Sequence, residues 1–245
     1  MKIFGLDFVS FTSRKSNQKM KKSLFILTTF LGYFVQAQFG IVQDKDGFAN
    51  VRDDKNISSK IVAKVNSNSI YPIDSDEENS KWYLVEYQPE KAGFVYYDRI
   101  KKLEDFETIS PTSVNDSKIE FSVADYTIQL ETQEFNSKKH KIFKESDFVY
   151  AIDEKDFLGS DGMIPQTEFK SFKISFKGKE IIIPKEYFIN LYNANLSATK
   201  LTYNKELNQY YLFGTYSDGA GVYDALWVLD NGKIVKHIAQ INAYA

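Results

Sequence analysis

Residues 82–97 read WYLVEYQPEKAGFVYY and hold two aromatic-rich runs, Trp82–Tyr87 and Gly93–Tyr97, with a short polar segment between them. Aromatic and β-branched side chains favour the half-buried surface of a pleated strand. Each run has the length of an ordinary strand, so the pattern predicts a strand in each. Because neighbouring residues on a strand point to opposite faces, we expect one of Tyr96 and Tyr97 to point outward.

Apolar runs of the same kind precede this stretch, and turn signals separate them. Asp46-Gly47 is one such signal, a pair that favours a tight turn. Pro72 lies inside a run and predicts an edge strand or a bend there. Strands of this length and spacing are typical of a small barrel or sandwich. The preceding runs are Phe39–Val42, Ala49–Arg52, Lys60–Val65 and Ile70–Ile73.

A spaced set of residues in this region forms a recognisable pattern: Asn50-Val51-Arg52, Ile61-Val62, Val65, Trp82, Val85, Gly93-Phe94-Val95 and Ile100. Over residues 38–103 this pattern resembles that of bacterial SH3-like domains. The family usually has a glycine turn where Asn68 stands, and Asn tolerates a positive φ. The resemblance implies a small β-barrel that binds peptides or cell-wall material, in which Asn50 and Arg52 have structural roles.

Residues 104–118 are polar and rich in turn formers, including Pro111, which is typical of a linker. We therefore predict two domains, at 38–103 and 119–245. The predicted fold class is mainly β, with a small SH3-like barrel followed by a larger β-rich (α+β) domain that has one short helix.

The second domain shows the alternation expected of half-buried strands. Phe172, Ile174 and Phe176 fall on one face of a run at a period of two. We expect strands at Tyr126–Thr132, Phe169–Phe176 and Glu180–Ile183, a helix at Lys185–Tyr192 begun by Pro184, and strands at Thr199–Tyr203, Tyr210–Tyr216, Val222–Leu229 and Lys233–Ala239. Tight hairpin turns are expected at Lys177-Gly178-Lys179 and at Asn231-Gly232.

Residues 1–37 are predicted to be an N-terminal extension and a secretory signal peptide. Met20-Lys21-Lys22 is basic, an apolar stretch follows, and Val35-x-Ala37 suits a cleavage site. The apolar stretch is shorter than the roughly 20 residues that span a bilayer. We therefore expect an exported mature chain, periplasmic or extracellular, without a membrane span, and we leave residues 1–19 out of the fold.

Composition narrows the classes of function. The chain has no cysteine, which excludes disulfides and thiol chemistry. The formal charge is −2, and residues 1–37 hold six basic groups and one acid, so the remainder has a net charge of −7. Nucleic acid is an unexpected ligand for such an acidic chain, because phosphate binding needs clustered Lys and Arg.

The chain offers few groups for catalysis. It has two histidines: we interpret His140, within a run of lysines, as part of a solvated turn, and His237 as a structural ring on the last strand. The acidic segment Asp153–Asp156 could suit calcium, but a solvated turn is the favoured interpretation. A G-x-S-x-G elbow is absent. We therefore predict no catalytic residue, no metal site and no cofactor.

Two groups of residues are candidate ligand contacts. Tyr71, Trp82, Tyr96 and Tyr97 could line a groove in the first domain, where rings stack on sugars or pack on peptides; plain packing is the alternative for each. The other group is the segment Ser217-Asp218-Gly219-Ala220-Gly221, which could form a binding loop. Asp218 would accept hydrogen bonds there, flanked by Tyr216 and Tyr223. A simple hairpin connection is the alternative for this loop.

The sequence favours an exported envelope binding protein that recognises cell-wall polymer, a peptide or a protein. A secreted cell-wall hydrolase with an SH3-like targeting module is the alternative from the enzyme class. An inhibitor or immunity protein that acts on an exported enzyme is a third possibility, because an acidic surface attracts basic partners.

Overall fold

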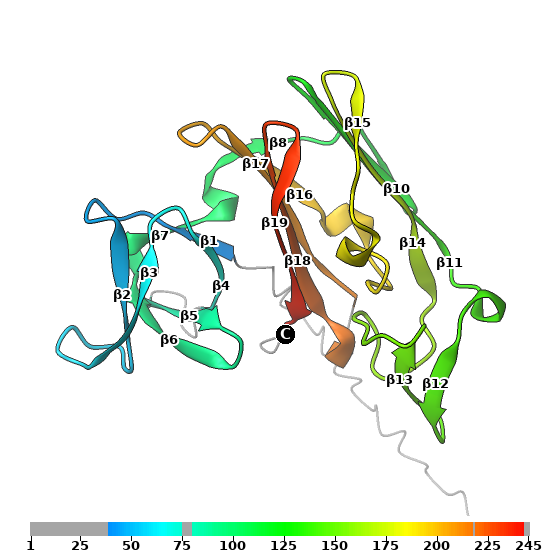
Figure 1. Cartoon of the computed structure of the whole chain (residues 1–245), viewed down its shortest axis with the longest axis horizontal. Coiled ribbons are helices and arrows are strands. Elements are labelled where there is room, and N and C mark those ends of the chain that lie inside the picture. Colours follow the sequence, from blue (N-terminus) through cyan, green and yellow to red (C-terminus); the bar gives the residue numbers. More distant parts are fainter. Residues whose placement is uncertain (1–38, 75–79, 218, 243–245) are drawn as a thin grey trace, which may run out of the picture. The chain divides into compact units, whose positions relative to one another are not determined.

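The computed structural model of the chain describes residues 39–74, 80–217 and 219–242. The predicted signal peptide at 1–37 and the candidate contact Asp218 lie outside these residues. Strands make up most of the described chain, so the mainly β fold class is confirmed (Figure 1). Within the described residues, no helix has the length and apolar character needed to cross a membrane.

Seven strands, all from residues 39–102, form one sheet with the order β3-β2-β6-β5-β4-β1-β7 (Figure 1). We call residues 39–103 the N-terminal module. Its strands are β1 (Phe39–Val42), β2 (Phe48–Arg52), β3 (Ile61–Asn66), β4 (Ile70–Asp74), β5 (Trp82–Gln88), β6 (Lys91–Tyr96) and β7 (Ile100–Lys102). A buried aliphatic cluster fills it: Val42, Ala49, Val51, Val65, Ile73, Val85, Val95 and Ile100.

Two details of the module agree with its sequence. Asn68 has a positive φ of 66°, a conformation that Asn tolerates. Strand β4 pairs with β1 through Ile70–Pro72 and with β5 through Ile73–Asp74. The pairing partner therefore changes at Pro72, which is a position where a residue without an N–H is tolerated.

Two five-stranded sheets form the rest of the fold. The central sheet has the order β19-β18-β17-β16-β8, and the outer sheet has the order β15-β14-β11-β10-β9 (Figure 1). A separate two-stranded sheet, which we call the arm, consists of β12 (Ile142–Glu145) and β13 (Phe148–Ile152). The other strands are β8 (Glu107–Ile109), β9 (Ser113–Asn115), β10 (Lys118–Val123), β11 (Tyr126–Glu134), β14 (Thr167–Phe176), β15 (Lys179–Ile181), β16 (Lys200–Asn204), β17 (Gln209–Tyr216), β18 (Tyr223–Asp230) and β19 (Lys233–Ile241).

Residues 104–118, predicted to be a linker, hold two short strands. Strand β8 pairs with β16 at the edge of the central sheet, and β9 pairs with β10 at the edge of the outer sheet. The segment therefore contributes one edge strand to each sheet. Its polar composition suits this place, because edge strands are kept short and polar.

Both predicted tight turns of the second half are confirmed. Phe176 pairs with Lys179, and Asp230 pairs with Lys233, so each turn has two central residues. All four central residues, Lys177-Gly178 and Asn231-Gly232, have positive φ angles. That conformation matches the right-handed twist of the flanking strands and explains the glycine at the second position.

The helix predicted for Lys185–Tyr192 is reduced to a three-residue 3-10 helix, η4 (Lys185–Tyr187). Tyr187 instead stacks its ring on His237, and Leu191 enters the core. The segment keeps single-turn hydrogen bonds, such as the one from the Ile189 N–H to the carbonyl oxygen of Lys185, while its apolar side chains pack on the sheets. The other 3-10 helices are η1 (Tyr97–Arg99), η2 (Leu103–Asp105), η3 (Ser137–Lys139), η5 (Leu196–Ala198) and η6 (Gly219–Gly221).

The largest core lies between the central and outer sheets. Phe172 and Ile174 of β14 are buried in it, and Phe176 packs against it, which confirms the predicted face. The central sheet contributes the alternate residues Tyr210 and Leu212 of β17 to this core. Strand β18 contributes its own alternate residues, Tyr223, Ala225, Trp227 and Leu229.

The opposite face of the central sheet packs on the N-terminal module. Tyr211 and Phe213 of β17, with Leu226 and Val228 of β18, form a second buried cluster with module residues. The residues from the N-terminal side are Phe39, Ile41, Ile70 and Leu103. Strands β17 and β18 are therefore covered on both faces, which explains why apolar residues occupy both positions of their two-residue period.

Polar contacts accompany this second interface. The buried Thr202 hydroxyl of β16 donates to the carbonyl oxygen of Leu103 at 2.9 Å. The Lys236 ammonium of β19 donates to the carbonyl oxygen of Ile70. It also lies 5.3 Å from the centre of the Tyr71 ring. Backbone oxygens at the edge of the apolar cluster are thereby satisfied.

We predict that Phe213→Ala lowers the free energy of unfolding by about 3–5 kcal/mol, because it leaves a cavity in a buried cluster. Urea unfolding measured by tryptophan fluorescence and far-UV circular dichroism checks this. The fluorescence combines Trp82 in the module with Trp227 in the central sheet, and circular dichroism reports on all strands. Both methods should therefore give one common midpoint. Val235→Ala, at a side chain that is 52% exposed, is the control and should change stability by less than about 0.5 kcal/mol. Separate midpoints for the two probes would contradict a shared core.

Candidate functional site

Three of the four aromatic residues predicted as contacts in the first domain lie together. Trp82 on β5 and Tyr96 on β6 are register partners, and their ring centres are 5.2 Å apart in an edge-to-face arrangement. Tyr97, the first residue of η1, lies 5.0 Å from Tyr96. We call Trp82, Tyr96 and Tyr97 the aromatic patch.

Local backbone geometry presents the patch to solvent. The chain leaves β6 at Tyr96 and enters η1, so Tyr97 no longer alternates as a strand residue would. The Tyr97 N–H donates to the carbonyl oxygen of Lys81 at 3.0 Å, which fixes the turn beside Trp82. Tyr97 is 46% exposed, while Trp82 and Tyr96 are half-buried. The outward residue of the Tyr96–Tyr97 pair is therefore Tyr97.

Tyr71, the fourth candidate, has a different environment. It packs against the core of the N-terminal module, and the Lys236 ammonium of β19 lies over its ring. The structure thus uses Tyr71 in the contact between the module and the central sheet. A cation over an aromatic ring contributes about 0.5–1 kcal/mol at an exposed site.

The second group of candidates is largely internal. Tyr216 and Tyr223 are fully buried, their ring centres are 5.4 Å apart, and the Tyr216 hydroxyl bonds to Thr199 at 2.9 Å. The Tyr223 hydroxyl is buried without a partner among the described atoms. A ligand on the surface cannot reach either ring, so both residues belong to the core rather than to a binding loop.

The loop between these tyrosines packs on the segment around Gly159. The Ser217 hydroxyl donates to the carbonyl oxygen of Gly159 at 2.9 Å. The Ala220 N–H donates to the Asp161 carboxylate at 3.2 Å. These contacts favour the simple connection over the binding loop for the described residues of this segment.

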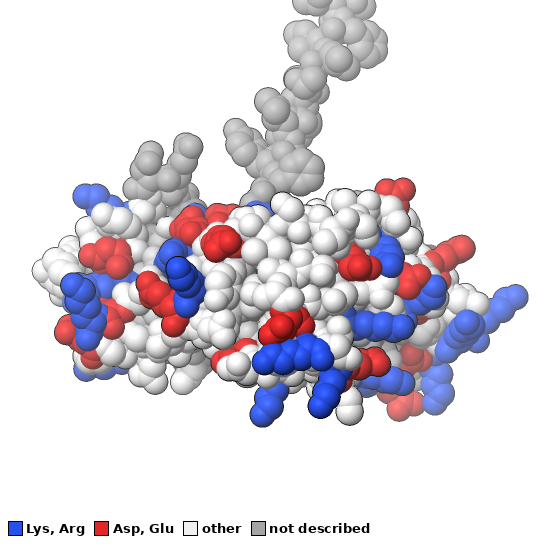
Figure 2. Space-filling model, turned by 90° about the horizontal axis from the view of Figure 1, so that it is seen from above, with Lys and Arg blue, Asp and Glu red and all other residues white. Residues whose placement is uncertain are grey.

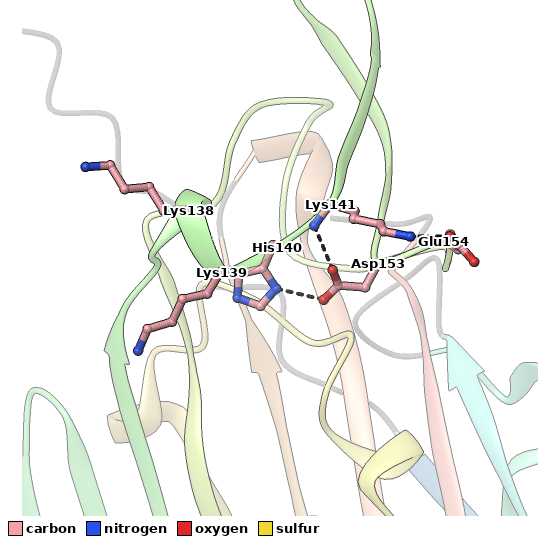
Figure 3. A pocket seen from close by; sticks show the side chains of 6 residues that line it. All are labelled: Lys138, Lys139, His140, Lys141, Asp153 and Glu154. Atoms are coloured by element: carbon pink, nitrogen blue, oxygen red, sulfur yellow. Dashed lines mark hydrogen bonds and ion pairs between the residues drawn. The ribbon is translucent and has the colours of Figure 1, made fainter.

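A shallow open pocket lies beside the arm, on the side of η3 (Figure 3). It has a volume of about 450 Å³ and is lined by Lys138, Lys139, His140, Lys141, Asp153 and Glu154. In Figure 3 the side chains of Lys138 and Lys139 extend away from the two acidic residues, whereas His140 and Lys141 point toward them. Two of the basic residues that line the pocket, His140 and Lys141, therefore contact its acids, and the two lysines of η3 extend outward.

His140 is not the solvated residue that its lysine-rich surroundings predict. Its side chain is 15% exposed, and its ring stacks on Phe135 with 4.7 Å between centres. Nδ1 lies 2.7 Å from Oδ2 of Asp153, and Nε2 lies 2.8 Å from Oε2 of Glu168. We call Asp153, His140 and Glu168 the carboxylate–histidine cluster. His140 comes just before β12, Asp153 comes just after β13, and Glu168 lies on β14.

The two carboxylates are held by further donors. The second oxygen of Asp153 accepts the Lys141 N–H at 2.8 Å, and the second oxygen of Glu168 accepts the Gln133 amide at 2.7 Å. Burial alone would raise the pKa of Asp153, but the hydrogen bonds from Lys141 and His140 and their positive charges lower it overall. Burial and the charges of Asp153 and Glu168 raise the pKa of nearby Tyr192.

This geometry restricts the chemistry of the cluster. Both ring nitrogens of His140 already contact carboxylates, so the ring does not stand as a base beside a hydroxyl nucleophile. The imidazole also occupies the space between the two carboxylates, where a glycosidic bond would have to lie. Among the described residues, no group of three or more His, Asp or Glu side chains is arranged to hold a metal ion.

His237 is the structural ring that its place on the last strand predicts. It stacks between Tyr187 and Trp227, at 4.6 Å and 5.5 Å between ring centres. Its Nε2 atom is buried and has no hydrogen-bond partner in the described structure. Burial lowers the pKa of His237 to about 4, so the ring is neutral at physiological pH.

Compared with known proteins, the chain matches no family model, no curated protein and no solved structure. The interpretation of its sites therefore depends on the geometry of this chain alone.

Asp224 of β18 is a buried acid next to the internal tyrosines. Its carboxylate accepts hydrogen bonds from Thr215 at 2.8 Å and Asn242 at 3.3 Å. Burial raises its pKa from 3.8 to about 6, and these hydrogen bonds offset part of the rise. Because the folded pKa is the higher one, the stabilisation is complete below about pH 4 and is lost as the pH rises to about 6.

We predict that the free energy of unfolding falls by about 2 kcal/mol between pH 4 and pH 6 through Asp224, out of about 3 kcal/mol for its whole titration, since each pKa unit corresponds to about 1.4 kcal/mol. Asp224→Asn should remove this slope and be the more stable protein at pH 8. Urea titrations of both proteins from pH 4 to pH 8 measure the effect. Asp98→Asn, at an exposed acid, should keep the slope of the wild type. Parallel curves for the wild type and Asp224→Asn would contradict the assignment.

Proposed function

We propose that the chain is an exported binding protein whose aromatic patch contacts cell-wall polymer or a peptide. The observation that supports this most is the contact of three aromatic side chains at one surface site, with Tyr97 46% exposed. Tyrosine and tryptophan combine a large apolar face with a polar edge, which suits sugar rings and extended peptides. The basic and apolar pattern before Ala37 supports export.

The position of the patch supports its availability to a ligand. The apolar contact of the module with the central sheet comes from β1, β4 and Leu103, and the Gln240 amide of β19 also donates to Glu86 of β5 at 3.4 Å. The patch residues, on β5, β6 and η1, take no part in these contacts. A ligand at the patch would therefore not compete with the contact between the module and the central sheet.

A hydrolase receives less support from the described residues. The two histidines are engaged, His140 by two carboxylates and His237 by two aromatic rings. Neither is placed as a general base next to a nucleophile or a substrate space. An SH3-like module used only for targeting would require the catalytic group elsewhere in the chain.

The face shown in Figure 2 gives little support to an inhibitor that finds a basic enzyme by long-range attraction. Acidic and basic side chains are interspersed over the face shown in Figure 2. Strong steering needs a surface of one sign, because mixed charges cancel beyond a few ångströms. The short-range contacts of an aromatic site fit the distribution of charge better.

We predict that Tyr97→Ala weakens binding of the full chain to isolated peptidoglycan by about tenfold or more, as expected when a central aromatic contact is truncated. Sedimentation of the protein with peptidoglycan at increasing polymer concentrations measures the affinity. Tyr150→Ala is the matched control, because Tyr150 is 54% exposed but lies on the arm. It should bind as the wild type does.

The same incubation distinguishes the alternatives. Equal binding by Tyr97→Ala, Tyr150→Ala and the wild type would contradict a role for the patch. Release of soluble fragments from the polymer would contradict the binding interpretation and favour the hydrolase. If the wild type does not sediment with peptidoglycan at all, cell-wall polymer is excluded as the ligand.

A further inference from the structure

The arm is attached to the rest of the fold through few elements. Its two strands form their own sheet, separate from the central and outer sheets. Val149 and Ile152 of its inner face form a small buried cluster with Phe135 and Tyr192. Its outer face is apolar and open, with Phe148 60% and Tyr150 54% exposed. A small core makes the arm sensitive to polar contacts at its base.

The carboxylate–histidine cluster lies at that base. His140 precedes β12, and Asp153 follows β13, so their contact closes the open end of the hairpin. The contact of His140 with Glu168 then ties this closed end to β14 of the outer sheet. Two further bonds reinforce the closure: the Asp153 N–H donates to the carbonyl oxygen of Lys141, and the Lys141 N–H donates to the Asp153 carboxylate.

Counting protons shows what these contacts require. A neutral imidazole has one N–H donor and one acceptor nitrogen, whereas an ionised carboxylate only accepts. Both contacts of His140, at 2.7 Å and 2.8 Å, are with carboxylate oxygens. With a neutral ring, one nitrogen lone pair would face an oxygen lone pair. With an imidazolium, both nitrogens donate, and both bonds are charge-assisted.

The other charged groups at the site are consistent with this assignment. Lys141 is paired with Glu154 at 3.0 Å, so these two charges offset each other at the rim. Tyr192, which packs from the opposite side, stays protonated because its pKa is raised. Lys138 and Lys139 on η3 extend away from the acidic residues (Figure 3). Asp153 and Glu168 are therefore the two negative charges that face His140.

We propose that His140 is held as an imidazolium ion between Asp153 and Glu168 and works as a pH-sensitive latch that fastens the arm to the outer sheet. Loss of the ring proton as the pH rises removes one of the two contacts and loosens the arm. The latch also has a limit on the acidic side. The lowered pKa of Asp153 means that its contribution is present above its ordinary pKa and is lost only as the pH falls below that.

The protonation state is tested by ¹⁵N chemical shifts of the histidine rings in the labelled full chain at pH 6. Two similar, protonated ring nitrogens are expected for His140. His237 provides an internal comparison, because its lowered pKa of about 4 keeps it neutral at this pH. A neutral tautomer of His140 at pH 6 would overturn the proposal.

The mechanical consequence is tested by amide hydrogen exchange of residues 142–152 at pH 6 and pH 9, corrected for the intrinsic rates. The loss of one charge-assisted hydrogen bond should raise arm exchange in the wild type by about tenfold or more at pH 9. Exchange in β17 and β18 should stay constant and shows that the fold is intact. Equal arm protection at both pH values in the wild type would overturn the proposal.

Two variants separate the latch from general effects of pH. His140→Phe retains ring stacking on Phe135 but removes the charge, so the arm should exchange fast at both pH values. Glu168→Gln offers an amide donor to Nε2, so a neutral ring can make both contacts. In this variant the arm should stay protected at pH 9. If arm exchange in either variant increases from pH 6 to pH 9 as much as in the wild type, the effect belongs to other groups and the proposal is overturned.

Discussion

Burial of one strand pair on both faces is the constraint on which the rest of this structure depends. Strands β17 and β18 direct Tyr210 and Trp227 into the core against the outer sheet, and Tyr211 and Phe213 into the cluster shared with the N-terminal module. Removal of either layer would expose a broad apolar face to water, at a cost of about 25 cal/mol for each Å². The N-terminal module therefore completes the hydrophobic core of the central sheet, in addition to having an aliphatic core of its own.

This constraint also decides which surfaces remain available. The module covers the central sheet with apolar side chains of β1, β4 and Leu103, and the aromatic rings of Trp82 and Tyr96 are not part of that apolar cluster. The outer sheet covers the other face, and the arm projects from the chain between β11 and β14. Two surfaces of different character result: one rigid and aromatic, supported by a packed module, and one held by a small core and a set of charges.

The sequence predicted the features that arise from local rules. Alternation placed Phe172 and Ile174 on a buried face, and the pair Asn231-Gly232 specified a two-residue turn, because these signals depend only on neighbouring residues. The internal location of Tyr216 was not predicted, because an isolated tyrosine next to glycines suits a loop and a core equally. The run Tyr210–Phe213 is apolar at every position, which is the signal of a strand buried on both faces.

His140 shows why the charged cluster could not be found in the same way. Its neighbours Lys138, Lys139 and Lys141 indicate a solvated turn, while its partners lie 13 and 28 positions further along the chain. Only the fold brings them together, because the arm folds back on itself and then meets β14. Removing charges from water is costly, so a partly buried set of charges such as this one needs further hydrogen bonds to its oxygens. The backbone N–H of Lys141 and the amide of Gln133 supply those bonds, and they restrict the carboxylates to orientations in which a doubly protonated ring fits between them.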